Sequence, residues 1–329
     1  MDNILVADGA TGIVRGEGGT LIQQANSFRI GGTVNRGTQN LDLSGLSNYV
    51  FDNAQGVYSV GGRAIGGAWN QTGATTGAVT LASGSNLIRA SYFGIGDVGR
   101  SISANATNQG TVRLGRNNTI YADRIILGGN QSSGTLTFQD SVTEGTLTLR
   151  GSDGSSAVGS WNIGTGNSSN YNDATGNVDL RRGTIDAKVD ALNIAGALYG
   201  NGSANGTLSL GRGVLEANTI MLGARSGTSG TGGSNGRLNI GEGGSVLANS
   251  ITMGNRTGTT GTVSANITLE GVRCAPAASW PALALVPVRS PSMMACWATV
   301  PQGRTCWSTF RWCWPQAASM RSASMAAMP

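Results

Sequence analysis

The chain of 329 residues contains no histidine, and its first 271 residues contain neither cysteine nor proline. The absence of histidine excludes Ser-His-Asp and Cys-His catalysis and every histidine-bound metal. The absence of cysteine excludes disulfides and thiolate ligands from the first 271 residues. No apolar run approaches the roughly 20 residues of a membrane-spanning helix, and we expect no signal peptide, because no basic segment precedes a long apolar one. We therefore expect a protein without metal or cofactor and without catalytic residues.

The missing residue types return abruptly after Gly271. All seven prolines, all four cysteines and five of the seven tryptophans lie in residues 272–329, whereas 52 of the 53 glycines precede them. The formal charge of +5 comes from five arginines in this tail, because residues 1–271 contain 17 basic and 17 acidic residues. The basic composition therefore gives no support for a nucleic-acid partner. We predict two unlike regions, 1–271 and 272–329.

Residues 272–329 also lack Ile, Asn, Asp, Glu, Lys, Tyr and His. A GC-rich gene read in the wrong frame produces such a composition. If one nucleotide is lost after Gly271, back-translation of the first ten tail residues into the restored frame gives residue classes that largely match the repeat at 213–223. We interpret the tail as a frameshifted, disordered or non-native extension that forms no domain. A genuine segment rich in Trp, Cys and Pro is the alternative.

Residues 1–271 repeat a pattern in which small and polar residues precede an apolar, a variable and an apolar residue and then glycine, as in 217–223. The first apolar residue recurs with a period of about 32 residues, at positions 28, 58, 93, 125, 161, 192, 220 and 251. A second pattern, in which apolar and polar residues alternate after glycine, precedes most copies and begins at Gly77, Gly110, Gly145, Gly176, Gly206 and Gly236. Such alternation predicts short strands with one buried face.

Each unit is thus predicted to hold two short strands separated by glycine turns, followed by a polar loop. One unit cannot bury its apolar face alone, but stacked units bury a continuous core. We predict an all-β fold, a parallel β-helix (solenoid) of about eight coils over residues 1–271. A disordered chain rich in Gly, Ser and Asn is the alternative, and the regular apolar alternation argues against it.

The consensus of 206–223, which returns at 236–254, resembles the passenger domains of bacterial autotransporters with adhesin-like β-helical repeats. The likeness covers roughly residues 10–271. It implies a virulence-associated, cell-surface or secreted protein that binds host or bacterial cell-surface molecules through polar loops, without catalysis. It also implies a full-length parent joined to an outer-membrane β-barrel. We expect neither the leader nor the barrel here, so the chain is interpreted as a fragment.

The densest charge cluster lies between residues 179 and 190, and its candidate face consists of Asp179, Arg181, Asp186, Lys188 and Asp190, with Arg182 beside them. Alternation predicts that residues 185, 187, 189 and 191 point inward and residues 186, 188 and 190 outward. We expect a solvated face with offsetting charges.

Two alternatives to an adhesin stay open. Outward carboxylates and basic residues also occur in β-helix enzymes that act on acidic polysaccharides, and a cleft lined by three carboxylates would favour that function. The chain could also be the non-functional product of a degraded gene.

Overall fold

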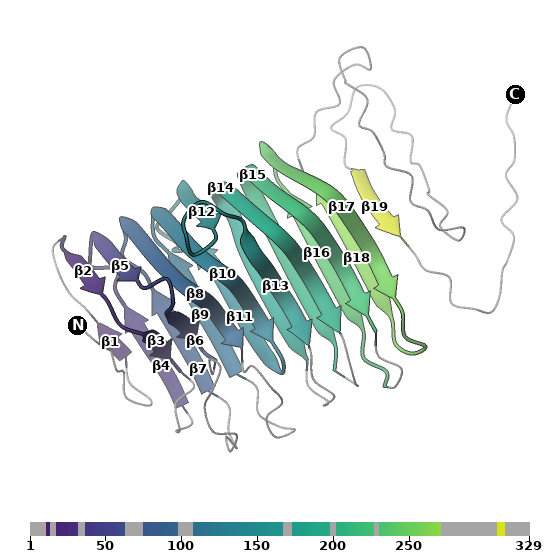
Figure 1. Ribbon diagram of the computed structural model, residues 1–329, viewed down its shortest axis with the longest axis horizontal. Helices are drawn as coiled ribbons and strands as arrows, with labels where there is room; N and C mark the ends of the chain where they lie inside the picture. The colour runs from purple at the N-terminus through teal and green to yellow at the C-terminus, as the bar shows by residue number, and fades with distance from the viewer. Residues whose placement is uncertain are drawn as a thin grey trace, which may run out of the picture.

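The computed structural model describes residues 11–13, 18–31, 37–62, 75–97, 108–166, 173–197, 202–226, 230–270 and 308–312. In these residues 19 strands and no helix form one continuous sheet that winds into a rod (Figure 1). Every strand pairing is parallel except that of β18 with β19. The predicted all-β parallel β-helix is therefore confirmed.

The strands stack on three faces of the rod. The first face consists of β1 (Thr11–Ile13), β4 (Gly37–Asp42), β7 (Thr75–Thr80), β9 (Asn108–Leu114), β11 (Ser132–Phe138), the starts of β14 (Ala174–Ala197) and β15 (Ala204–Arg225), β16 (Ser234–Ile240) and β18 (Val263–Leu269). The second face consists of β2 (Thr20–Gln23), β5 (Asn48–Asp52), the starts of β8 (Ser85–Asp97) and β10 (Asn117–Gly129), β12 (Gly145–Arg150), the middles of β14 and β15, and the start of β17 (Gly244–Arg256). The third face consists of β3 (Ser27–Ile30), β6 (Val57–Val60), β13 (Val158–Gly166) and the ends of β8, β10, β14, β15 and β17.

One strand segment from each face makes one coil of the solenoid. Within the described residues there are eight such coils, from β1–β2–β3 to β16 with the two halves of β17, and seven stacking steps join them. The strand β18 begins a further coil. The predicted number of about eight coils agrees with this arrangement.

The third face aligns the repeats in the predicted register. Successive pairings form one row through positions 28, 58, 93, 125, 161, 192, 220 and 251. The side chains of this row are buried up to Ile220. In the first three coils the row is aromatic, and the ring of Tyr58 stacks on those of Phe28 and Phe93 at centroid distances of 4.2 and 5.3 Å. The first apolar residue of each repeat is thus part of the core that its coil contributes from the third face.

Each coil then begins its turn at a residue with positive φ, and the fourth coil adds Asn130 and Gln131. These first residues are Gly31, Gly61, Gly96, Gly128, Gly164, Ala195, Gly223 and Gly254. Glycine adopts this left-handed conformation without the steric cost that a Cβ atom imposes. A glycine of the first face packs against the turn from the other side. At Gly206, for example, a Cβ atom would lie 2.4 Å from the carbonyl oxygen of Ile163 and 2.6 Å from the nitrogen of Ala195. Glycine therefore closes the coil for two reasons, backbone conformation and close backbone approach.

Two details of the predicted unit were wrong. Each coil has three strand segments rather than two, because the second-face segment commonly runs into the third without glycine, as in β8, β10, β14, β15 and β17. In addition, Gly145 belongs to the second face, where it pairs with Gly183. The glycine that continues the first-face row is Gly134, which pairs with Gly110 and Gly176. The same alternating pattern occurs on both faces, so the pattern alone does not separate them.

The C-terminal end of the rod differs from its middle. In residues 272–329 the structure describes only β19 (Ser308–Trp312), which runs antiparallel to β18 (Figure 1). The rest of the predicted tail and the N-terminal segment lie outside the described residues. Among the described residues, no helix has the length and apolar character needed to cross a membrane.

Candidate functional site

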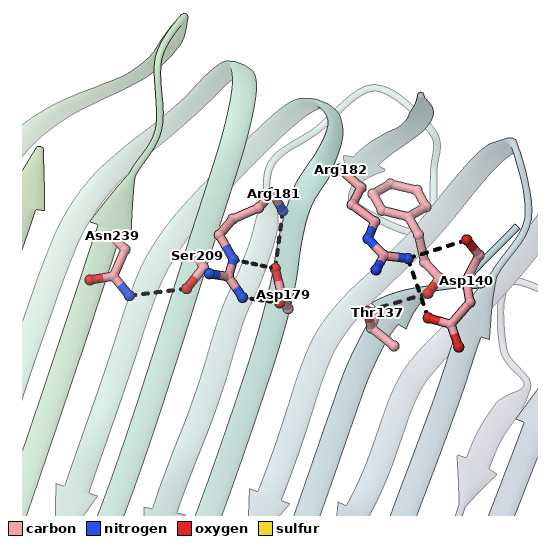
Figure 2. A network of polar contacts seen from close by, with 8 residues as sticks. Thr137, Asp140, Asp179, Arg181, Arg182, Ser209 and Asn239 are labelled. Atoms are coloured by element: carbon pink, nitrogen blue, oxygen red, sulfur yellow. Dashed lines mark hydrogen bonds and ion pairs between the residues drawn. The ribbon is translucent and has the colours of Figure 1, made fainter. Parts of the chain in front are cut away.

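The predicted charged residues do not converge on one site. Asp179 and Arg181 lie where β14 leaves the first face, and they pair with each other (Figure 2). Arg181 donates from Nη2 to Asp179 Oδ2 at 2.6 Å and from Nε to Oδ1 at 2.9 Å. These hydrogen bonds lower the pKa of the Asp179 carboxyl and raise that of the Arg181 guanidinium. The two side chains therefore offset each other's charge on the surface of the first face.

Arg182 turns away from this pair. Its Nη1 atom lies 3.2 Å from Oδ1 of Asp140, which belongs to the loop after β11 (Figure 2). Both side chains are more than half exposed, and such solvent-exposed ion pairs contribute little to stability. Arg182 is therefore separated from the other basic residues of the cluster.

The second face carries the remaining three predicted residues. Residues 185, 187 and 189 are buried and residues 186, 188 and 190 are exposed, as the alternation predicts. Ala191 was predicted to point inward but is partly exposed. The reason is the corner between the second and third faces, where two successive residues face outward before Leu192 returns to the core.

Asp186 is held by the preceding coil. Arg150 donates from Nη2 to both carboxylate oxygens of Asp186 at 2.8 Å, and from Nη1 to its carbonyl oxygen at 2.9 Å. One guanidinium nitrogen thus contacts both carboxylate oxygens, and such charge-assisted hydrogen bonds are stronger than neutral ones. Asp186 therefore joins two coils.

Lys188 and Asp190, in contrast, line an open groove at the corner of the second and third faces. The other polar residues of its lining are Glu216, Asn218 and Asn249, and Leu247 is its large apolar residue. Because Lys188 pairs with Glu216 and Glu216 with Leu247 in successive coils, the groove runs along the axis of the rod. Its volume is about 630 Å³, within the roughly 300–1,000 Å³ of ligand pockets.

Two rows of side chains border the groove. In one row, Asn249 donates from Nδ2 to Asn218 Oδ1 at 3.0 Å, and Asn218 donates from Nδ2 to Asp190 Oδ1 at 2.9 Å. In the other, Lys188 Nζ lies 3.8 Å from Glu216 Oε2, and both side chains are about half exposed. The hydrogen bonds of the amide row are 2.9 and 3.0 Å long, whereas the Lys188–Glu216 ion pair is longer than a hydrogen bond.

A loop over residues 151–157 packs on the same face and brings Ala157 to the end of the groove. The carbonyl oxygen of Ser152 accepts a 2.7 Å hydrogen bond from Arg89 Nε, and its N–H donates to Asp123 Oδ1 at 2.9 Å. Within the loop, Asp153 Oδ1 accepts from the backbone N–H groups of Ser155 and Ser156, each at 2.8 Å. These two donors lower the pKa of Asp153 to about 2.

The groove offers hydrogen-bonding groups and the exposed apolar side chain of Leu247. Among the described residues of its lining the ionisable groups are Lys188, Asp190 and Glu216. It contains two carboxylates, fewer than the three that would favour an enzyme. Among the described residues no group of three or more His, Cys, Asp or Glu side chains could hold a metal ion. Sequence reasoning missed Glu216, Asn218 and Asn249, although the recurring Ala-Asn pair at 217–218 and 248–249 was a usable signal.

The fold and the groove define a three-sided parallel β-helix with an open axial groove. Comparisons of the chain with protein-family models, with curated proteins and with solved structures found no match.

Proposed function

We propose that this chain is an adhesin-like structural β-helix, a cell-surface or secreted fragment of an autotransporter passenger that binds surface molecules without catalysis. The observation that carries the proposal is the outer surface of the rod. Four of the candidate charged residues already form ion pairs or hydrogen bonds with other side chains of the rod, namely Asp179, Asp186, Lys188 and Asp190. Between these pairs lie rows of small polar side chains, which suit binding by many weak contacts.

The first face illustrates such a row. Thr111, Thr135, Asn177 and Thr207 pair in register on successive coils, and each is at least partly exposed. On a neighbouring row the partly exposed Asn239 donates from Nδ2 to Oγ of the buried Ser209 at 3.0 Å (Figure 2). Parallel strands repeat these groups roughly every 4.8 Å. A stiff, regular surface of this kind supports an adhesive role.

The test is binding of the full chain, immobilised on beads, to host epithelial cells and to bacterial cells. We expect saturable binding to at least one cell type, which the soluble chain competes away. The matched control is the heat-denatured chain on the same beads, which has the same composition and no ordered surface. Equal binding by folded and denatured chains, or none by either, would overturn the adhesive function.

A polysaccharide-acting enzyme is the second candidate. The observation that raises it is the groove in which Asp190 and Glu216 lie with Lys188, although two carboxylates are fewer than the three that would favour catalysis. The measurement is the release of new chain ends from acidic and neutral polysaccharides by the full chain. Activity that disappears in both Asp190→Asn and Glu216→Gln variants would establish the enzyme and overturn the non-catalytic proposal.

A non-functional product of a degraded gene is the third candidate, favoured by the change of composition at residue 272. Sequencing of the locus tests it. A restored reading frame that encodes further repeats downstream of codon 271 would support the frameshift, and its absence would contradict the frameshift.

A further inference from the structure

The amide row of the groove presents hydrogen-bonding groups at regular intervals. Asn218 and Asn249 each use an amide N–H on the preceding side chain of the row. A primary amide has two N–H donors and a carbonyl oxygen with two lone pairs. Each asparagine therefore has further hydrogen-bonding capacity toward a ligand, and one such group recurs per coil, roughly every 4.8 Å.

The other side of the groove is partly apolar. Leu247 is 57% exposed, and Ala217 and Ala248 lie between the two rows. A ligand that fits must therefore offer hydroxyl or carbonyl groups along one edge and an apolar surface along the other. Sugar rings have this character, since their hydroxyl groups lie around the edge and their C–H bonds form the faces.

The charge of the groove separates neutral from acidic ligands. Lys188 contributes one positive charge and Asp190 and Glu216 contribute two negative charges, so the lining has a formal net charge of −1. Like charges that face each other across an interface are unfavourable. The groove therefore favours a neutral chain over an acidic polysaccharide.

The geometry of the groove also disfavours a peptide. An extended peptide advances about 3.3 Å per residue, so its groups fall out of step with coils spaced roughly 4.8 Å apart. Peptides that bind β-structure commonly pair with the edge of a sheet. The groove instead lies on the outer surface of strands β14, β15 and β17, which already pair with one another.

We infer that this groove binds a neutral glycan chain, which lies along the rod axis between the row Asp190–Asn218–Asn249 and the side chain of Leu247. The inference rests on the proposed binding function and names the ligand class of one part of the surface. Asn218 and Asn249 donate to sugar hydroxyls, Asp190 accepts from them, and Leu247 packs on a ring face.

The experiment is binding of the full chain to a panel of immobilised oligosaccharides, with neutral oligomers of glucose, galactose and mannose, acidic galacturonate oligomers and an extended polar peptide. We expect binding to at least one neutral series and weaker binding to the acidic one. Because a hydrogen bond contributes about 0.5–1.5 kcal/mol, Asn218→Ala should weaken binding roughly 2- to 13-fold. Leu247→Arg should abolish it by blocking the groove.

Two controls keep the result interpretable. Thr119→Ala changes a small, partly exposed side chain of β10 that lies outside the groove lining and should leave binding unchanged. Leu247 lies in the last complete coil and is largely exposed, so its substitution is expected to leave the rod folded, which circular dichroism and the melting temperature would check.

The outcomes separate the inference from the proposed function. Glycan binding in the panel that persists unchanged in the Asn218→Ala and Leu247→Arg variants would overturn the groove inference and leave the adhesive function standing. Preference for galacturonate or for the peptide would also overturn it. If the unaltered chain binds no cells, the adhesive function is overturned. Glycan binding in the panel that the two variants weaken would still support the groove inference.

Discussion

A left-handed residue begins the turn of each coil at the end of the third face. Seven of the eight coils use glycine there, and the sixth uses Ala195 with φ of 60°. The alanine shows that the conformation itself is tolerated with a Cβ atom when space allows. The cost of a side chain at the other positions therefore depends mainly on the neighbouring coils.

The substitution Gly164→Ala should destabilise the protein much more than Gly254→Ala. Both positions have positive φ, so both pay the left-handed penalty of about 1–2 kcal/mol. At Gly164 the new Cβ would also lie 1.9 Å from the carbonyl oxygen of Asn205, whereas at Gly254 no atom lies within 4 Å. Overpacking adds about 1–3 kcal/mol. Denaturant unfolding of the two variants measures the difference, and equal losses of stability would show that the coils do not pack this closely.

The Asp153 loop should loosen in acid. The N–H groups of Ser155 and Ser156 lower the pKa of the Asp153 carboxyl from 3.8 to about 2. A depressed pKa stabilises the folded loop above pH 3.8, and this contribution is lost as the pH falls toward about 2. Amide NMR shifts of Ser155 and Ser156 should follow that titration. In Asp153→Asn the amide does not ionise, so the shifts should stay constant; an unaltered transition in that variant would assign the titration to another group.

At the scale of the strands, alternation decides which side chains form the core. In β15, Leu208 is fully buried and the adjacent Thr207 is partly exposed. The same alternation identified the inward residues of β14 from the sequence. It did not reveal the second-face strand as a separate element, because the corner at Asp190 and Ala191 is made by two outward residues and carries no glycine.

Leu208→Ala should cost about 2–5 kcal/mol, because it removes buried methyl groups and leaves a cavity in the core. Thr207→Ala, one residue earlier and on the outer surface, should stay within about 0.5 kcal/mol of the unaltered protein. Urea unfolding followed by circular dichroism compares the two. Similar losses in both variants would mean that the inward and outward assignments of β15 are wrong.

At the scale of the whole molecule, the ends of the rod differ from its middle. The large hydrophobic residues that are exposed within the described part of the chain lie in the first and last complete coils, namely Ile13, Ile22, Leu247 and Ile251. Ile251 continues the third-face row that the inner coils bury, and a terminal coil has only one neighbour to cover it. Leu247, in contrast, is in register with the exposed Lys188 and Glu216. The β19 strand pairs with β18 alone, on the first face.

Hydrogen exchange of the full chain should therefore be fastest in β17 and slowest in β14. Both strands pair with β15, but β14 also pairs with β11, β12 and β13, and no described strand pairs with the outer edge of β17. Stability in a solenoid is close to a sum of neighbour contacts, so β17 should open first. Exchange measured by mass spectrometry tests this, with β15 as the internal reference. Uniform protection across the three strands would indicate that the rod unfolds in one step.

The sequence by itself determined the class of fold, the coil period and the inward row of the third face, because alternation and glycine turns are local properties that each repeat expresses alone. Only the tertiary structure decided which residues of different coils meet. Asp190, Asn218 and Asn249 are 28 and 31 residues apart, and they form one row because strand register brings them together. The loops between strands vary in length, so sequence spacing could not assign Arg150 to Asp186 or bring Ala157 to the end of the groove. Hydrogen-bond pairing between coils settles that register, and with it the candidate binding surface.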